Sequence, residues 1–332
     1  MKTTLEILKS QLPNAEGEKR IGILLSIIES SNYAPIATMT VYLEELFDLC
    51  QGLAYKESLA AVYLAQYEVY SRNGKTDLCL NVLKKRHEVL EQTDNHYLIT
   101  DSYIKIGICH RNQIAYKEAK VCYEKALALA QLHKIEVLEY QTYNTLAVDY
   151  FREGDKVKAN EYFIKALNGF NKIGNKKFAA AVYSNLVGHK LVSSKEKSIE
   201  YLQKAIEINL EIKNWEWLAT NYAELAQIFY EQGDFDKFLT YINKCIEEAK
   251  KKPSNYHLAM AYYLLAHYCL KEGIKKEENP DLALIEKSDF WSLTLNNHLK
   301  NLPNSQFEIL IKYAVQYFKA RQHLIVKRDR IF

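Results

Sequence analysis

Apolar and small residues recur along this chain with a period of about 40 residues. Each period contains a tyrosine, followed three residues later by leucine or isoleucine in five of six cases and one place further by a mostly small residue. Spacings of three and four place these side chains on one stripe of a helix. The pattern therefore predicts an amphipathic helix around each of six tyrosines: Tyr63, Tyr103, Tyr143, Tyr183, Tyr222 and Tyr262.

A second helix follows the first in each period. Eleven residues after the tyrosine, four of the six periods have a glycine, which adopts the left-handed conformation that ends a helix without a Cβ clash. Small and bulky residues then follow at helical spacing, so each period predicts a helix, a tight turn and an antiparallel helix. In the fourth period Ser198 comes one place early, which indicates that one residue is missing from the turn.

The period that shows the pattern most fully resembles the tetratricopeptide repeat (TPR). Its matching residues are Tyr143, Leu146, Ala147, Tyr150, Gly154, Ala159, Phe163 and Ala166. The resemblance implies an all-α fold: a right-handed superhelical solenoid of antiparallel helix pairs, with about six clear repeats, a degenerate N-terminal repeat and a long C-terminal helix. The period exceeds the family's usual length of about 34 residues, so longer helices are expected, and the proline that often ends a repeat is absent.

Both ends of the chain depart from the repeat pattern. Residues 1–54 are predicted to form an N-terminal cap, with helices over 3–12, 17–30 and 35–52, of which the last two form the degenerate repeat. The six repeats are expected over 55–302, and one helix over 303–332. A heptad seam from Leu310 to Ile331 leaves two readings of that last helix open: a cap on the final repeat, or a coiled coil that dimerises through residues 304–332.

Composition and charge narrow the function classes. A net charge of +3 and a pI near 8.3 are too mild to indicate nucleic acid or membrane as a partner. The apolar runs are too short for a signal peptide or a bilayer-spanning helix. Six cysteines without a CxxC pair indicate reduced thiols rather than a disulfide framework, so a cytoplasmic location is expected.

No motif in the sequence supports catalysis. The chain has no glycine-rich phosphate loop, no GxSxG and no HExxH, and its nine histidines are scattered. We therefore predict no catalytic residue, no cofactor and no metal site.

The resemblance implies that first helices line a concave groove that takes a peptide or a protein segment. Amides at Asn144 and Asn185 could pair with the N–H and C=O groups of an extended peptide, and nearby basic residues could hold a carboxylate. The alternative is that these polar groups are only the solvated side of the solenoid. The predicted groove residues are Lys105, Arg111, Asn144, Arg152, Asn185, Gln227 and Tyr230.

The leading hypothesis is a non-enzymatic TPR scaffold that binds a peptide or protein, with no nucleic acid and no membrane. A second is the sensor region of a bacterial signalling protein, such as a histidine kinase, nucleotide cyclase or transcription regulator, that dimerises through its C-terminal helix. A third is a peptide-regulated response-regulator phosphatase, whose relatives carry a catalytic glutamine in an N-terminal helical bundle. Residues 1–54 are short for such a bundle, and neither Gln11 nor Gln51 lies in a matching motif.

Overall fold

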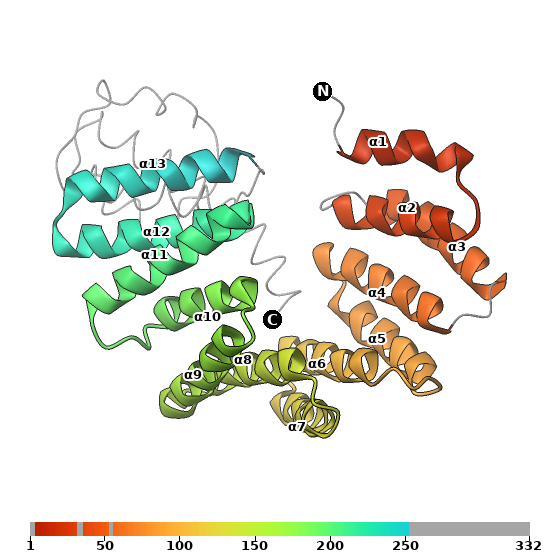
Figure 1. Ribbon diagram of the computed structural model, residues 1–332, viewed down its shortest axis with the longest axis horizontal. Coiled ribbons are helices and arrows are strands. Elements are labelled where there is room, and N and C mark those ends of the chain that lie inside the picture. The colour runs from red at the N-terminus through yellow and green to blue at the C-terminus, as the bar shows by residue number, and fades with distance from the viewer. Residues whose placement is uncertain (1–3, 32–35, 53–55, 252–332) are drawn as a thin grey trace, which may run out of the picture. The chain divides into compact units, whose positions relative to one another are not determined.

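The computed structural model describes residues 4–31, 36–52 and 56–251, and all of their regular structure is helical (Figure 1). The chain divides into two compact units, the first of which ends at Asp155 and the second of which begins at Lys156. The prediction of an all-α array of helix pairs is confirmed in this part of the chain. The sixth repeat and the helix predicted over 303–332 lie outside the described residues, so both readings of that helix stay predictions.

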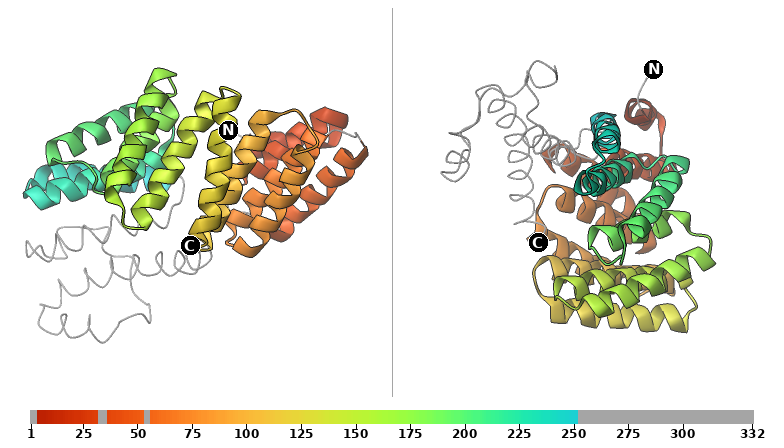
Figure 2. Two further views of the ribbon diagram at one scale, coloured as in Figure 1. Left: turned by 90° about the horizontal axis from the view of Figure 1, so that it is seen from below. Right: turned by 90° about the vertical axis from the view of Figure 1, so that its left-hand side faces the viewer.

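The first unit contains the N-terminal cap and the first helices of the array. Its elements, in chain order, are α1 (Thr4–Gln11), the 3₁₀ helix η1 (Leu12–Asn14), α2 (Gly17–Ser30), α3 (Ile36–Gly52), α4 (Lys56–Arg72), α5 (Thr76–Leu90), α6 (His96–Asn112), α7 (Tyr116–Leu132) and α8 (Glu136–Arg152). The second unit contains α9 (Lys156–Lys172), α10 (Lys176–Gly188), α11 (Lys195–Glu211), α12 (Trp215–Gln232) and α13 (Phe235–Lys251), shown from two further sides in Figure 2.

The three helices predicted in the cap are present. The degenerate repeat, α2 and α3, buries one apolar cluster against α4, with Leu24, Leu46 and Val62 at its centre. Ile23 stands in the tyrosine position of the repeat and is buried beside α1. The cap therefore continues the core of the first full repeat.

Small residues allow the helices of a pair to approach each other. Ala119 and Ala126 on α7 are fully buried, and a Cβ on Gly107 of α6 would overlap the ring of Tyr123. Because the backbones come this close, the aromatic ring fills the space that a side chain on α6 would need.

The turns share one hydrogen-bond pattern. Gly74, Gly154 and Gly233 have φ angles of 70°, 89° and 78°, as expected for a left-handed helix cap, and Ile114 adopts the same conformation with φ 63°. In each case the residue after the left-handed position donates its N–H to a carbonyl five residues earlier, as from Lys75 to Tyr70 at 2.9 Å. The turn geometry is therefore the same in the repeat that has Ile114 in place of glycine.

The fourth repeat corrects one sequence-based interpretation. It does not simply lack one residue in its turn, because α10 is 13 residues long, whereas α4, α6 and α8 have 17 each. The left-handed cap is Lys190 at φ 54°, about one helical turn earlier than in other repeats. A longer connection leads to Ser194, whose Oγ accepts a hydrogen bond from the N–H of Lys197 at 3.2 Å and caps α11.

The tyrosines that recur once in each repeat lie between helices, and lysine side chains lie over the rings of three of them. Tyr183 and Tyr222 are buried. The ring centroid of Tyr183 lies 4.9 Å from that of Tyr201 on α11. Lysine ammonium groups from the second helices lie over three of these rings, at 5.4 Å for Lys125 on Tyr103, 5.9 Å for Lys204 on Tyr183 and 5.8 Å for Lys244 on Tyr222. These tyrosines therefore contribute to packing between helices, and three of them make the same kind of cation–π contact.

Candidate functional site

The predicted groove residues all lie on first helices of repeats. In the first unit, α6 carries Lys105 and Arg111, and α8 carries Asn144 and Arg152. In the second unit, Asn185 lies on α10, and Gln227 and Tyr230 lie on α12. Within each unit these helices are neighbours, since α6 packs against α8 and α10 against α12.

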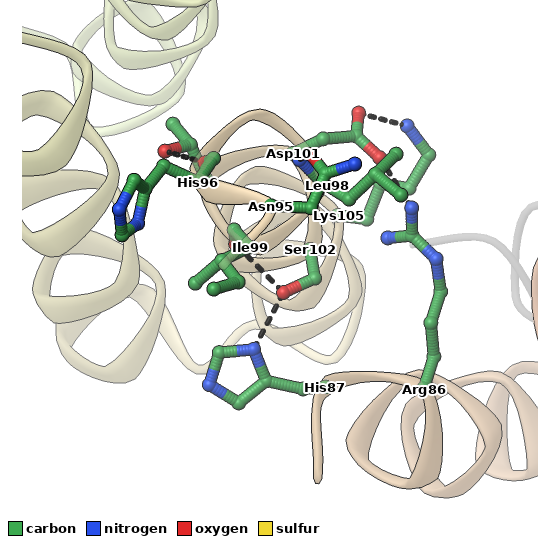
Figure 3. Close-up of polar contacts among 10 residues, drawn as sticks. Arg86, His87, Asn95, His96, Leu98, Ile99, Asp101, Ser102 and Lys105 are labelled. Carbon is green, nitrogen blue, oxygen red and sulfur yellow. Dashed lines mark hydrogen bonds and ion pairs between the residues drawn. The ribbon is translucent and has the colours of Figure 1, made fainter. Parts of the chain in front are cut away.

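Lys105 is held by an ion pair on its own helix. Its Nζ donates to Oδ1 of Asp101 at 2.5 Å, while Nη2 of Arg86 on α5 donates to Oδ2 of the same carboxylate at 2.9 Å (Figure 3). The Arg86 side chain is 2% exposed. Two cations therefore share one carboxylate, and part of the charge of Lys105 is already balanced inside the protein.

His87, which follows Arg86 on α5, also contacts α6. Nδ1 of His87 lies 2.5 Å from Oγ of Ser102 (Figure 3). The His87 ring also packs against that of Tyr103, with centroids 4.3 Å apart. Burial lowers the pKa of His87, although Glu91 opposes this shift. The contacts connect α5 to α6 and position the helix that carries Lys105.

Arg111 reaches across to α8. Its Nη1 donates to Oδ1 of Asp149 at 3.4 Å, and the Asp149 side chain is fully buried. Burial raises the pKa of Asp149 to about 6, against the opposing effect of Arg111. Oδ2 of Asp149 and Nε of Arg111 are buried without hydrogen-bond partners among the described residues. Asp149 therefore neutralises much of the positive charge of Arg111, which the repeat pattern had predicted would bind a carboxylate of the ligand.

The remaining residues predicted in the first unit differ in exposure. Asn144 is partly buried, whereas Arg152 is exposed at the end of α8 and contributes a positive field that lowers the pKa of Asp149. In the second unit Asn185 and Tyr230 are partly buried, and the Tyr230 ring packs against Phe238 with centroids 5.4 Å apart. Packing of this kind holds an aromatic side chain in one orientation.

A pocket of about 340 Å³ lies in the second unit between α10 and α12. Its size is at the lower end of the range of small-ligand sites, roughly 300–1,000 Å³. One face of α12 and the connection after α10 supply most of the lining, and the predicted residue Gln227 is part of it. Nε2 of Gln227 donates to Oε1 of Glu231, which lies at the same pocket.

The pocket contains a carboxyl group with an abnormal environment. Oε2 of Glu224 is buried and has no hydrogen-bond partner among the described residues. Burial raises the pKa of Glu224 to about 8. A Cβ on Gly188 of α10 would lie 2.8 Å from Oε1 of Glu224, so the carboxyl occupies space that any other residue at 188 would reduce.

A buried polar ladder fixes the helices that surround this pocket. Nδ2 of Asn209 on α11 donates to Oδ1 of Asn221 on α12 at 3.0 Å. Nδ2 of Asn221 donates to Oγ of Ser184 on α10 at 2.6 Å. All three side chains are buried, so the ladder satisfies their polar groups and sets the positions of three helices.

The residues selected from the sequence for the groove do not include two acidic residues, Asp149 and Glu224. Asp149 occupies a position six residues after its tyrosine, where the preceding repeats have the buried residues Val69 and Cys109. An acidic residue at a position that is apolar in the preceding repeats is a sequence signal that could have identified Asp149. Glu224 lies two residues after its tyrosine, in the same register as the predicted residues Lys105 and Asn185, but its significance depends on Gly188 in the adjacent repeat.

Comparison with known proteins agrees with this architecture. The tetratricopeptide repeat family profile matches residues 100–131 and 219–252. No curated protein sequence matches the chain significantly. The chain therefore contains tetratricopeptide repeats at two sites, the first covering most of α6 and of α7 and the second most of α12 and all of α13.

Three solved structures share the fold over most of the chain at low identity. A Rap protein complexed with Competence and Sporulation Factor is 14% identical, with a TM-score of 0.61 over 98% of this chain and 91% of that chain. NprR in complex with its cognate peptide NprX is 15% identical, with a TM-score of 0.55 and coverages of 96% and 91%. Aspartyl phosphate phosphatase F from Bacillus subtilis is 14% identical, with a TM-score of 0.52 and coverages of 97% and 94%.

At these low sequence identities, the structural similarity shows a shared fold and assigns no activity to this chain. In the part of the chain that the structure describes, no helix has the length and apolar character needed to cross a membrane. The five cysteines described there are free.

Proposed function

We propose that this protein binds a peptide or a short protein segment on the first-helix side of its repeats and catalyses no reaction itself. The observation that carries the proposal is the pocket between α10 and α12, whose lining includes Gln227, a residue that the repeat pattern already assigned to the binding side. The fold supports it as well, since a Rap protein has been solved in complex with Competence and Sporulation Factor and NprR in complex with its cognate peptide.

The chemistry of the proposed contacts follows from the polar side chains on the first helices. The partly buried amides of Asn144 and Asn185 each offer a donor and an acceptor to a peptide backbone. Arg152 is exposed at the end of α8 and supplies the positive charge for an acidic group. In this proposal Lys105 and Arg111 act mainly by orienting their helices, because Asp101 and Asp149 already engage them.

The proposal also places the protein in the cytoplasm. Four of the five described cysteines are buried and all five are free, which fits a reducing compartment. Fractionation of cells that express the full chain would test this location.

The binding function is tested with a displayed library of random heptapeptides, panned against the intact chain. Recovered peptides are synthesised, and their affinity is measured for the wild type and for the double variant Asn185→Ala with Gln227→Ala, two predicted groove residues of the second unit. We expect the double variant to bind about tenfold more weakly or worse, because the amide contacts to the backbone are lost.

A matched control removes two amides elsewhere. Asn168 on α9 and Asn243 on α13 are exposed on second helices, so the variant Asn168→Ala with Asn243→Ala should retain wild-type affinity. If no heptapeptide is recovered with the intact chain, or if both double variants bind like the wild type, the proposed function is wrong.

A further inference from the structure

The pocket between α10 and α12 combines an unpaired buried carboxyl with open space beside it. Oε2 of Glu224 has no hydrogen-bond partner among the described residues, and burial is the cause of its raised pKa. Buried carboxyl groups are normally hydrogen-bonded or paired, because leaving one unsatisfied is unfavourable. A ligand group that donates hydrogen bonds into the pocket would supply the missing partner.

The space beside the carboxyl comes from one glycine. At the position of Gly188, five residues after the tyrosine, the other described repeats have Glu68, Ile108, Val148 and Gln227. A Cβ at 188 would approach Oε1 of Glu224 to 2.8 Å. Because α10 also ends at Gly188, the connection to α11 continues the pocket wall there.

The other charged groups that line the pocket are Lys190, Lys195 and Glu231. Nζ of Lys195 lies 3.8 Å from Oε2 of Glu231, and both side chains are more than 40% exposed, at 47% and 44%. Lys190 is also exposed. The lysines are thus at the solvated rim, where one is paired, whereas the buried part of the pocket has a single ionisable group, Glu224.

We infer that this pocket is a subsite for a cationic side chain, the guanidinium of arginine or the ammonium of lysine, presented by the peptide ligand to Glu224. The inference rests on the proposed function and adds the chemistry of one ligand position. A guanidinium or ammonium group supplies only donors, which match the acceptor oxygens of an ionised carboxylate. When the cation enters, the carboxyl releases its proton to solvent and forms the ion pair.

The test begins with the heptapeptides recovered by the intact chain. The expected result is that arginine or lysine is enriched at one fixed position of the recovered sequences. One such peptide is then synthesised with arginine and with citrulline, its neutral counterpart, at that position. Affinities of both peptides are measured for the wild type and for Glu224→Gln, which keeps the shape of the side chain.

A direct contact predicts strong coupling between the two changes. Either change alone should weaken binding about tenfold, the amount expected for loss of a charge-assisted hydrogen bond, and the second change should add little. The control Glu231→Gln removes an exposed charge of the same pocket and should alter the affinity by less than about threefold.

A second variant makes the test independent of Glu224→Gln. Gly188→Ala places a methyl group beside the carboxyl and should also remove the preference for the arginine peptide over the citrulline peptide. Circular dichroism melts confirm that each variant is folded.

Each outcome has one meaning. If peptides are recovered without an enriched basic position, or if the effects of citrulline and Glu224→Gln are additive, the subsite is wrong and the peptide-binding function stands. If the intact chain recovers no peptide, both proposals are wrong.

Discussion

Arg111 donates a hydrogen bond from Nη1 to Oδ1 of Asp149 at 3.4 Å, and the two residues lie 38 positions apart in neighbouring repeats of the first unit. The side chain of Asp149 is 0% exposed and that of Arg111 is 13% exposed. The raised pKa of Asp149 means that burial disfavours its charge more than Arg111 favours it. The pair is therefore a structural connection between α6 and α8.

Removing both members of the pair should reduce stability by less than the sum of the two single losses. Asp149→Asn leaves Arg111 partly buried without its carboxylate, and we expect a loss of about 3 kcal/mol in the free energy of unfolding. Arg111→Met should cost a similar amount at pH 8 and less at pH 5, because the pKa of the isolated Asp149 carboxyl rises further and protonation removes its charge.

The double variant completes the cycle. We expect it to be more stable than the sum of the single losses by about 0.5–3 kcal/mol. Urea denaturation followed by circular dichroism gives these values, and Lys117→Met, at an exposed position of α7, is the control. Additive losses would show that the two side chains do not interact energetically.

Glu224→Gln should stabilise the protein in a pH-dependent way. Folding raises the carboxyl pKa from 4.5 to about 8, so the folded state binds more protons between these values and its stability falls as the pH rises through them. The glutamine variant lacks this loss. We expect equal stability below pH 4.5 and an advantage on the order of 5 kcal/mol above pH 8.

Thermal melts of both proteins from pH 4 to pH 9 would measure the difference. Glu231→Gln, at the exposed rim of the same pocket, is the control and should show no such trend. A Glu224→Gln advantage that is constant with pH would contradict the assigned burial of the carboxyl.

Ile114→Gly should also be stabilising. Ile114 has φ 63° and is 66% exposed, so it occupies a left-handed conformation that a β-branched residue disfavours while burying little apolar surface. Glycine removes the Cβ clash, and we expect a gain of about 1 kcal/mol in the free energy of unfolding. The reverse change, Gly154→Ala at φ 89°, should lose about as much. Chemical denaturation of both variants tests this, and a loss for Ile114→Gly would mean that the side chain contributes packing that its exposure does not indicate.

Asn221→Ala should destabilise the second unit. The change leaves Nδ2 of Asn209 and Oγ of Ser184 without their partner on α12, and all three positions are buried. Unsatisfied buried polar groups cost about 1–3 kcal/mol each, so we expect a loss of at least about 2 kcal/mol. Urea denaturation is again the measurement, with the exposed Asn243→Ala as control. A loss below 0.5 kcal/mol, the usual limit for surface changes, would show that water replaces the amide.

The sequence by itself determined the architecture of the described helix pairs. Its period placed the first and second helices, the small residues at their crossings, the glycine-capped turns and the three cap helices. These features depend on local conformational preference and on which residues share one face of a helix, and both can be read from spacing along the chain. Only the turn of the fourth repeat differed, because α10 ends about one helical turn early, at Gly188.

The tertiary structure decided which polar groups are available to a ligand. The sequence placed Arg111 on the binding side, but only packing of α6 against α8 brings Asp149 to its guanidinium. Likewise, Glu224 is unusual only because Gly188 of the preceding repeat leaves space beside it and the surrounding helices bury its Oε2. Such pairings join residues nearly one repeat apart, and burial and charge compensation arise only when neighbouring repeats pack together, so the periodic pattern within one repeat does not contain them.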